Sequence, residues 1–151
     1  MKVAPVAILP IIKERTVPLT IDRAFELFTV RMVEWWPLAT HSIGGAAAAG
    51  IRFEPVVGGR VLEVSQDSTE SSWADVIAWD PPERFVLAWH PSLEPEAASI
   101  VEIRFHSVTD GTVVHVEHRG WEEFGAEHGE QLRAGYYPGW DMVLAGFTGA
   151  A

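Results

Sequence analysis

The sequence of 151 residues contains no cysteine. Disulfides, thiolate zinc sites, iron–sulfur clusters and cysteine nucleophiles are therefore excluded together, and the absence fits a reducing cytoplasm. Basic residues are also scarce, because 11 Lys and Arg stand against 21 Asp and Glu and leave a formal net charge of −10. Such a charge repels phosphate groups, so we expect no nucleic-acid partner.

Long apolar runs are missing as well. No stretch of about 18 apolar residues occurs, so we expect no membrane-spanning helix and no membrane partner. Aromatic residues are plentiful instead, with seven Trp, seven Phe and two Tyr. They fill protein cores, but they also line pockets for apolar ligands. The length fits one domain over residues 1–151, and the sequence shows no internal repeat and no linker.

Hydrophobic spacing predicts an α+β architecture. A first strand is expected over 11–17, ended by Pro18, and then a helix capped by Thr20. Alternating apolar residues predict further strands near 51–55, 61–64, 73–79, 85–89, 101–106 and 114–119. Asp110-Gly111 predicts the hairpin turn before the last of these strands.

Helical spacing returns at the end of the chain. Apolar residues recur there at every third or fourth position, which places them on one stripe of a helix: Leu132, Tyr136, Trp140, Val143 and Phe147. Pro138 lies inside this pattern and is expected to kink the helix or to break it into two pieces. The pattern as a whole predicts an antiparallel sheet that wraps around this helix.

Short motifs follow in a characteristic order along nearly the whole chain. They include 17–25, Trp35-Trp36-Pro37, Gly58-Gly59-Arg60, 78–85, 87–89, Gly111-Thr112, 118–121 and Gly139-Trp140. In order and spacing they resemble the START-like (SRPBCC) superfamily, and within it the bacterial proteins similar to the activator of heat-shock protein 90 ATPase. The resemblance implies a helix-grip fold, in which about six to seven curved antiparallel strands hold a long C-terminal helix around an internal cavity. It does not imply one activity, because this fold carries binders, transporters and enzymes.

In such a fold, the alternation along each strand predicts which side chains face the cavity. Val101 and Val143 are expected on these faces. The residues that we predict to bind a ligand are Phe53, Trp73, Asp75, Ile77, Phe85, Leu87, Trp89, Ile103, Phe105, Val116, His118, Tyr136 and Trp140. The alternative is a filled core without a cavity. Trp35 and Trp36 are adjacent, so we expect one to pack inward and the other to cover the cavity entrance or a partner surface.

His118 lies on an otherwise apolar strand face. It is either a core histidine with a backbone or tyrosine partner, or a group that orients a ligand or transfers a proton. Asp75 is either a buried partner for an Arg or Trp, or a polar group aimed into the cavity. Together they are the one acid–base pair that the sequence offers to an enzyme.

Other chemistry finds no support in the residue spacing. The six histidines form no HExxH or other metal-ligand signature, and no GxSxG, GxGxxG or P-loop sequence occurs. We therefore predict no metal and no cofactor, and we assign no catalytic residue.

The function predicted from the sequence is that of a cytoplasmic protein that binds a hydrophobic or aromatic small molecule between sheet and C-terminal helix. Two alternatives stay open: a polyketide cyclase/dehydratase-like enzyme of the same fold, and a stress-related interaction module that modulates a chaperone ATPase. A homodimer or a chaperone contact is left open with them.

Overall fold

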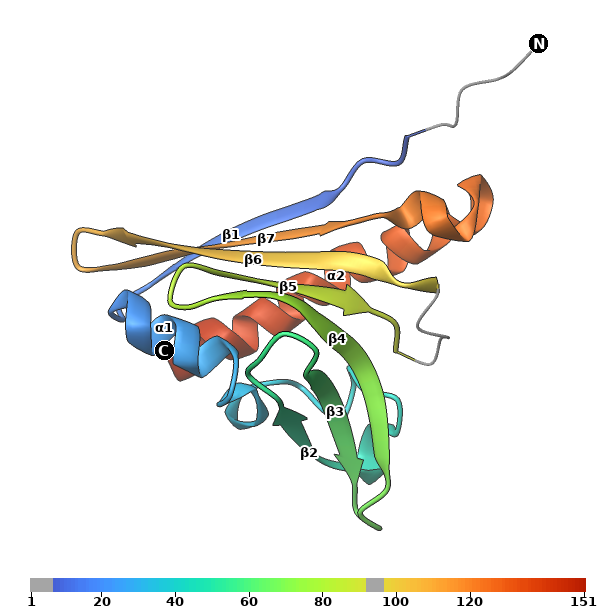
Figure 1. Ribbon diagram of the computed structural model, residues 1–151, viewed down its shortest axis with the longest axis horizontal. Coiled ribbons are helices and arrows are strands. Elements are labelled where there is room, and N and C mark those ends of the chain that lie inside the picture. The colour runs from blue at the N-terminus through green and yellow to red at the C-terminus, as the bar shows by residue number, and fades with distance from the viewer. Residues whose placement is uncertain (1–6, 92–96) are drawn as a thin grey trace.

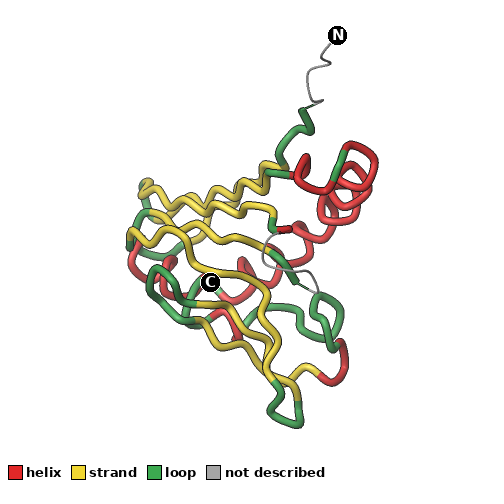
Figure 2. The backbone as a smooth tube through the Cα atoms, turned by 45° about the vertical axis from the view of Figure 1, so that its right-hand side comes forward, coloured by secondary structure: helices red, strands yellow, loops and turns green. Residues whose placement is uncertain are grey.

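The computed structural model describes residues 7–91 and 97–151. Seven antiparallel strands form one curved sheet, and a helix of 25 residues lies across it (Figure 1). The strand order is β1-β7-β6-β5-β4-β3-β2, so every pair of neighbours except β1 and β7 is consecutive along the chain. Figure 2 shows how the strands curl rather than lie flat. The α+β helix-grip architecture expected from the sequence is confirmed.

The elements have the following bounds in chain order: β1 Ile11–Val17, α1 Ile21–Phe28, β2 Ala48–Phe53, β3 Arg60–Ser65, β4 Glu70–Asp80, β5 Arg84–Trp89, β6 Ser99–Val108, β7 Gly111–Arg119 and α2 Ala126–Ala150. The predicted first strand matches β1 at both ends. Most of the other strands extend a few residues beyond the predicted ranges, because backbone pairing continues where the apolar alternation has faded. No helix in the described ranges is long and apolar enough to cross a membrane.

Helix α1 closes one end of the space between the sheet and α2. The Thr20 hydroxyl caps the helix by accepting a backbone N–H three residues on, at 3.4 Å. The buried face of α1 then contacts both layers. The Phe25 ring lies 5.1 Å from that of Phe105 on the sheet, and the Phe28 ring lies 4.9 Å from that of Phe147 on α2. This half of the interior is therefore filled with phenylalanine.

Helix α2 runs without interruption from 126 to 150, with Pro138 inside it. Of the two effects predicted for Pro138, a kink or a break into two pieces, the break does not occur. Pro138 cannot donate to the carbonyl of Ala134, but both residues lie on the exposed side of the helix, where solvent can reach that carbonyl. The predicted apolar stripe is buried at Trp140, Val143 and Phe147.

The adjacent tryptophans are both buried, but they have different surroundings: Trp35 packs in the core, and Trp36 also lines the cleft described below. Trp35 is 7% exposed and Trp36 is 9% exposed. Their segment passes between two parts of the interior, so successive side chains reach different neighbours. The Trp35 ring lies 5.2 Å from Phe147, whereas the Trp36 ring lies 5.1 Å from Trp73.

Strand β4 carries two irregularities that change the face of its side chains. Trp73 has no partner in the pairing with β3, and Ile77 has none in the pairing with β5. Each such bulge resets the alternation. Ile77 is consequently 48% exposed, and Asp75 pairs with Ala88 on the side of the sheet away from the core. The prediction that Asp75 and Ile77 face the interior is wrong.

Candidate ligand-binding cleft

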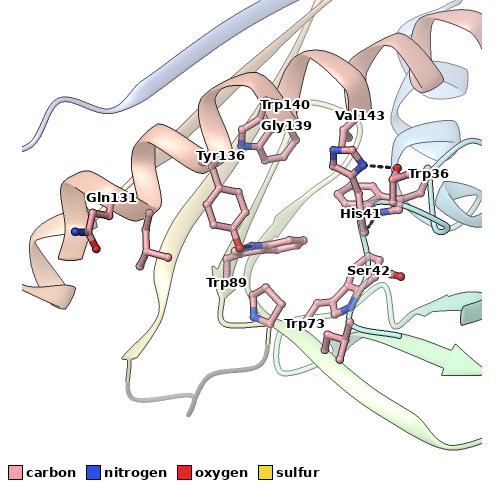
Figure 3. A pocket seen from close by; sticks show the side chains of 15 residues that line it. Trp36, His41, Ser42, Trp73, Trp89, Gln131, Tyr136, Gly139, Trp140 and Val143 are labelled. Atoms are coloured by element: carbon pink, nitrogen blue, oxygen red, sulfur yellow. Dashed lines mark hydrogen bonds between the residues drawn. The ribbon is translucent and has the colours of Figure 1, made fainter. Parts of the chain in front are cut away.

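A cleft of about 430 Å³ opens between α2, the ends of β4 and β5, and the segment 36–43 (Figure 3). This volume falls within the range of small-molecule sites. Its walls are formed by Trp36, Thr40, His41, Ser42, Ile43, Trp73, Trp89, Pro91, Gln131, Leu132, Gly135, Tyr136, Gly139, Trp140 and Val143. Four of the seven tryptophans of the chain are among them.

Each of these four tryptophans already uses its indole N–H within the protein. The Trp36 N–H donates to the His41 carbonyl at 2.7 Å, and the Trp73 N–H donates to the Glu63 carboxylate at 2.9 Å. The Trp89 N–H donates to the Tyr136 hydroxyl at 3.1 Å, and the Trp140 N–H donates to the His118 imidazole at 3.0 Å. The indole rings therefore present carbon faces and edges to the cleft rather than hydrogen-bond donors. Most of the wall is apolar as a result.

His118 lies behind Trp140 and is completely buried. Its Nδ1 accepts the Trp140 indole N–H at 3.0 Å, so the ring proton is on Nε2, which donates to the Ser99 hydroxyl at 2.7 Å. Burial lowers the pKa of His118 to about 3, and the ring is neutral at pH 7. His118 is thus a core histidine that orients a wall residue and does not itself reach the cleft.

The acid–base pair proposed from the sequence does not form. The Asp75 carboxylate accepts a hydrogen bond from Nε2–H of His90 at 3.0 Å, while both ring nitrogens of His118 are engaged by Ser99 and Trp140. His118 and Asp75 therefore do not meet, because the bulge of β4 at Trp73 turns Asp75 to the outer side of the sheet.

Glu63 fixes the loop that forms the far wall of the cleft. Its carboxylate is 3% exposed and accepts three hydrogen bonds. The donors are the backbone N–H groups of Ile43 and Gly44, at 2.7 and 2.8 Å, and the indole of Trp73, at 2.9 Å. Hydrogen bonds to a carboxylate are stronger than those between neutral groups. Strand β3 therefore holds the loop in place through the side chain of Glu63.

Comparison with known proteins identifies the family. The family model described as "Activator of Hsp90 ATPase homolog 1-like protein" matches residues 18–151. The chain belongs to this family. The resemblance inferred from the sequence is confirmed, and no curated protein matches the chain significantly.

Several solved structures have a fold similar to that of this chain over almost its whole length. Txn09, an anthrahydroquino-γ-pyrone synthase complexed with a compound designated SUM, has 27% identity and a TM-score of 0.64, with coverage of 96% of this chain and 98% of Txn09. Ms6760 from Mycobacterium smegmatis has 16% identity and a TM-score of 0.68, with 94% and 90% covered. The Aha1 dimer from Colwellia psychrerythraea has 14% identity and a TM-score of 0.63, with 95% and 96% covered.

The cleft of this family member contains only part of the predicted set. Trp73, Trp89, Tyr136 and Trp140 line it. Other predicted residues are buried but lie away from the cleft, in the packed interior: Phe53, Phe85, Leu87, Ile103, Phe105 and Val116. Alternation predicted the correct face for these residues. It could not show that α1 fills one half of that face.

The sequence reasoning missed the wall contributed by the segment 36–43 and by the small residues of α2. Thr40, His41 and Ser42 belong to the first group, and Gly135 and Gly139 to the second, whereas Trp36 is one of the two tryptophans considered as a cover of the cavity entrance. The segment has no periodicity from which a facing direction could be derived. The only signal is the succession of polar residues at 40–42, which follows the two tryptophans after residues 37–39.

Proposed function

We propose that the protein binds a planar, largely apolar aromatic molecule in this cleft. The observation that carries the proposal is the set of four indole rings whose N–H groups are all satisfied inside the protein. Such rings stack on a flat apolar ligand, and they do not have to be desolvated as donors when it binds.

The comparison with Txn09 supports a ligand with fused rings. The name of that protein describes a synthase of a fused aromatic product, and its identity to this chain is 27% over nearly the full length. We infer the same class of ligand here, without assigning a reaction to it. A cleft of about 430 Å³ is large enough for a molecule of this kind.

Binding can be tested by filling the cleft from the helix. Gly135 lines the cleft, and a Cβ added there would meet no heavy atom within 4 Å. The side chain of Gly135→Leu therefore starts in open space at the wall of the cleft. Gly149→Leu is the matched control, because Gly149 is also helical and open but lies outside the cleft.

The probe is N-phenyl-1-naphthylamine, a neutral fused-ring dye whose fluorescence rises in apolar surroundings. We expect saturable binding to the wild type and to Gly149→Leu, and binding about tenfold weaker or worse to Gly135→Leu. The proposal fails if the wild type shows no saturable binding, or if Gly135→Leu binds the dye as tightly as the control does.

Location and assembly stay predictions. A cytoplasmic location is supported by the lack of cysteine. A homodimer is supported by the dimeric state printed for the Colwellia psychrerythraea relative. The cyclase-like enzyme and the stress-related module that modulates a chaperone ATPase also stay predictions, and the binding proposed here does not depend on either of them.

A further inference from the structure

The cleft has one polar end, formed by Thr40, His41 and Ser42. The Ser42 hydroxyl is engaged on both sides there, because it donates to the Leu38 carbonyl and accepts the backbone N–H of Gly45 at 2.8 Å. The imidazole of His41 is engaged on one side only. Its Nδ1 lies 2.7 Å from the Thr40 hydroxyl, whereas Nε2 has no hydrogen-bond partner within the described part of the chain.

The free edge of the His41 ring faces α2 across the cleft. A Cβ added at Gly139 would lie 3.8 Å from Nε2, so the glycine leaves the space in front of this nitrogen open. In Figure 3 the ring stands below α2, at the end of the cleft opposite Gln131. Nε2 is therefore accessible from the cleft.

The hydrogen bonds of Thr40 favour a proton on Nδ1 of His41. The Thr40 hydroxyl also reaches the Pro37 carbonyl, at 3.5 Å, and that oxygen can only accept. With its own proton directed to Pro37, the hydroxyl accepts from Nδ1–H of His41. Nε2 is then unprotonated and presents a lone pair to the cleft.

The opposite role falls to Tyr136. Its hydroxyl oxygen accepts the Trp89 indole N–H at 3.1 Å, and its own proton has no acceptor among the described residues. Burial raises the pKa of Tyr136, so the hydroxyl keeps that proton. The cleft thus offers a ligand an acceptor at His41 and a donor at Tyr136, in addition to the Gln131 amide at its other end.

We propose that Nε2 of His41 accepts a hydrogen bond from a hydroxyl group of the bound ligand, and that the cleft thereby selects hydroxylated planar aromatic ligands over ligands without the hydroxyl. The inference rests on the proposed function and adds the chemical class of the ligand. Sites with few polar groups derive their selectivity from those groups, because an unmatched buried acceptor disfavours the wrong ligand.

Three ligands with one ring system test it: 2-hydroxyanthraquinone, 2-methoxyanthraquinone and anthraquinone. All three carry carbonyl groups that Tyr136 can bind, but only the first has a proton for His41. Dissociation constants are measured by quenching of the tryptophan fluorescence. We expect the hydroxylated ligand to bind the wild type about three- to tenfold more tightly than the other two.

His41→Phe keeps a flat ring and removes the acceptor. In this variant we expect the three ligands to bind with equal affinity. His106→Phe is the control, because His106 is exposed on β6 outside the cleft, and it keeps the preference. Thr40→Val removes the group that orients the ring and is expected to reduce the preference even if His41→Phe folds poorly.

The possible results separate the two proposals. If the wild type binds none of the three ligands, the proposed function itself fails. If it binds all three equally, or if both His41→Phe and Thr40→Val keep the preference, the proposed function stands and the role of His41 is refuted.

Discussion

Trp140 joins the wall of the cleft to the histidine behind it. Its side chain is 4% exposed, and it supplies the hydrogen bond to Nδ1 of His118. Trp140→Ala empties a large buried volume and also leaves that nitrogen without a donor. We expect the free energy of unfolding in urea to fall by about 3–5 kcal/mol. Leu132→Ala, at a half-buried position, is expected to cost clearly less, and equal losses would show that Trp140 is not a core residue.

The neutral state of His118 makes the stability of the fold depend on pH. Burial lowers its pKa from 6.5 to about 3, so between these values the unfolded chain binds a proton that the folded protein does not. The stability that neutral His118 contributes is fully present above pH 6.5. As the pH falls from 6.5 towards 3, the free energy of unfolding decreases by about 1.4 kcal/mol per pH unit from this group.

The check is urea unfolding from pH 7 to pH 4, for the wild type and for His118→Asn. The carboxylates contribute equally in both proteins, so the difference between the two slopes isolates His118. We expect a steeper loss in the wild type. Parallel curves would mean that His118 is already protonated in the fold, or that it titrates normally.

At the scale of elements, the glycines of α2 serve two different purposes. An added Cβ at Gly146 would lie 2.4 Å from the Trp35 carbonyl oxygen, so this glycine lets α2 approach the segment of the paired tryptophans. At Gly135 an added Cβ meets open space. The first glycine is needed for packing, and the second keeps the cleft empty.

Alanine at these two positions is expected to act in opposite directions. Gly135→Ala raises the free energy of unfolding by about 1 kcal/mol, because alanine favours the helix. Gly146→Ala lowers it by about 1–3 kcal/mol, because the backbone of Trp35 cannot yield without disturbing its neighbours. Thermal unfolding of both variants measures these changes. A Gly146→Ala variant more stable than the wild type would contradict the close approach of Gly146 to the Trp35 carbonyl.

The strands were predictable from alternation, and the deviations within them were not. The limits of β1 follow from its pattern and from Pro18, since both signals are local. The bulges at Trp73 and Ile77 depend on how β4 pairs with its neighbours, which the sequence of β4 alone does not contain. A shift of one residue turned Asp75 outward and removed it from the candidate site.

The loop with His41 was unpredictable for a related reason. Its position depends on the Glu63 carboxylate, which is 20 residues away from Ile43 in the sequence and bonds its backbone N–H. A glutamate on a strand gives no sign that it is buried until the loop that it holds is placed. The sequence therefore indicated a cavity and five of its wall residues, Trp73, Trp89, Tyr136, Trp140 and Val143, but not its polar end.

At the scale of the whole molecule, the two halves of the interior differ in their aromatic residues. Phenylalanines of α1, β5, β6 and α2 pack on one another at one end. At the other end the tryptophans surround the cleft, with the Trp36 ring 5.1 Å from Trp73 and 6.5 Å from Trp140. The phenylalanine rings fill the core at one end, whereas the tryptophan rings, whose N–H groups are satisfied, line an apolar cleft at the other.

Ligand binding in this opening is tested most directly by the indole ¹H–¹⁵N NMR signals of the seven tryptophans during titration with N-phenyl-1-naphthylamine. Trp36, Trp73, Trp89 and Trp140 line the cleft, and their signals are expected to shift together and to saturate. The other three lie outside it and are expected to change little: Trp35, Trp79 and Trp121. No saturable shift, or the largest shifts among these three, would contradict a binding site between α2 and the loop of His41.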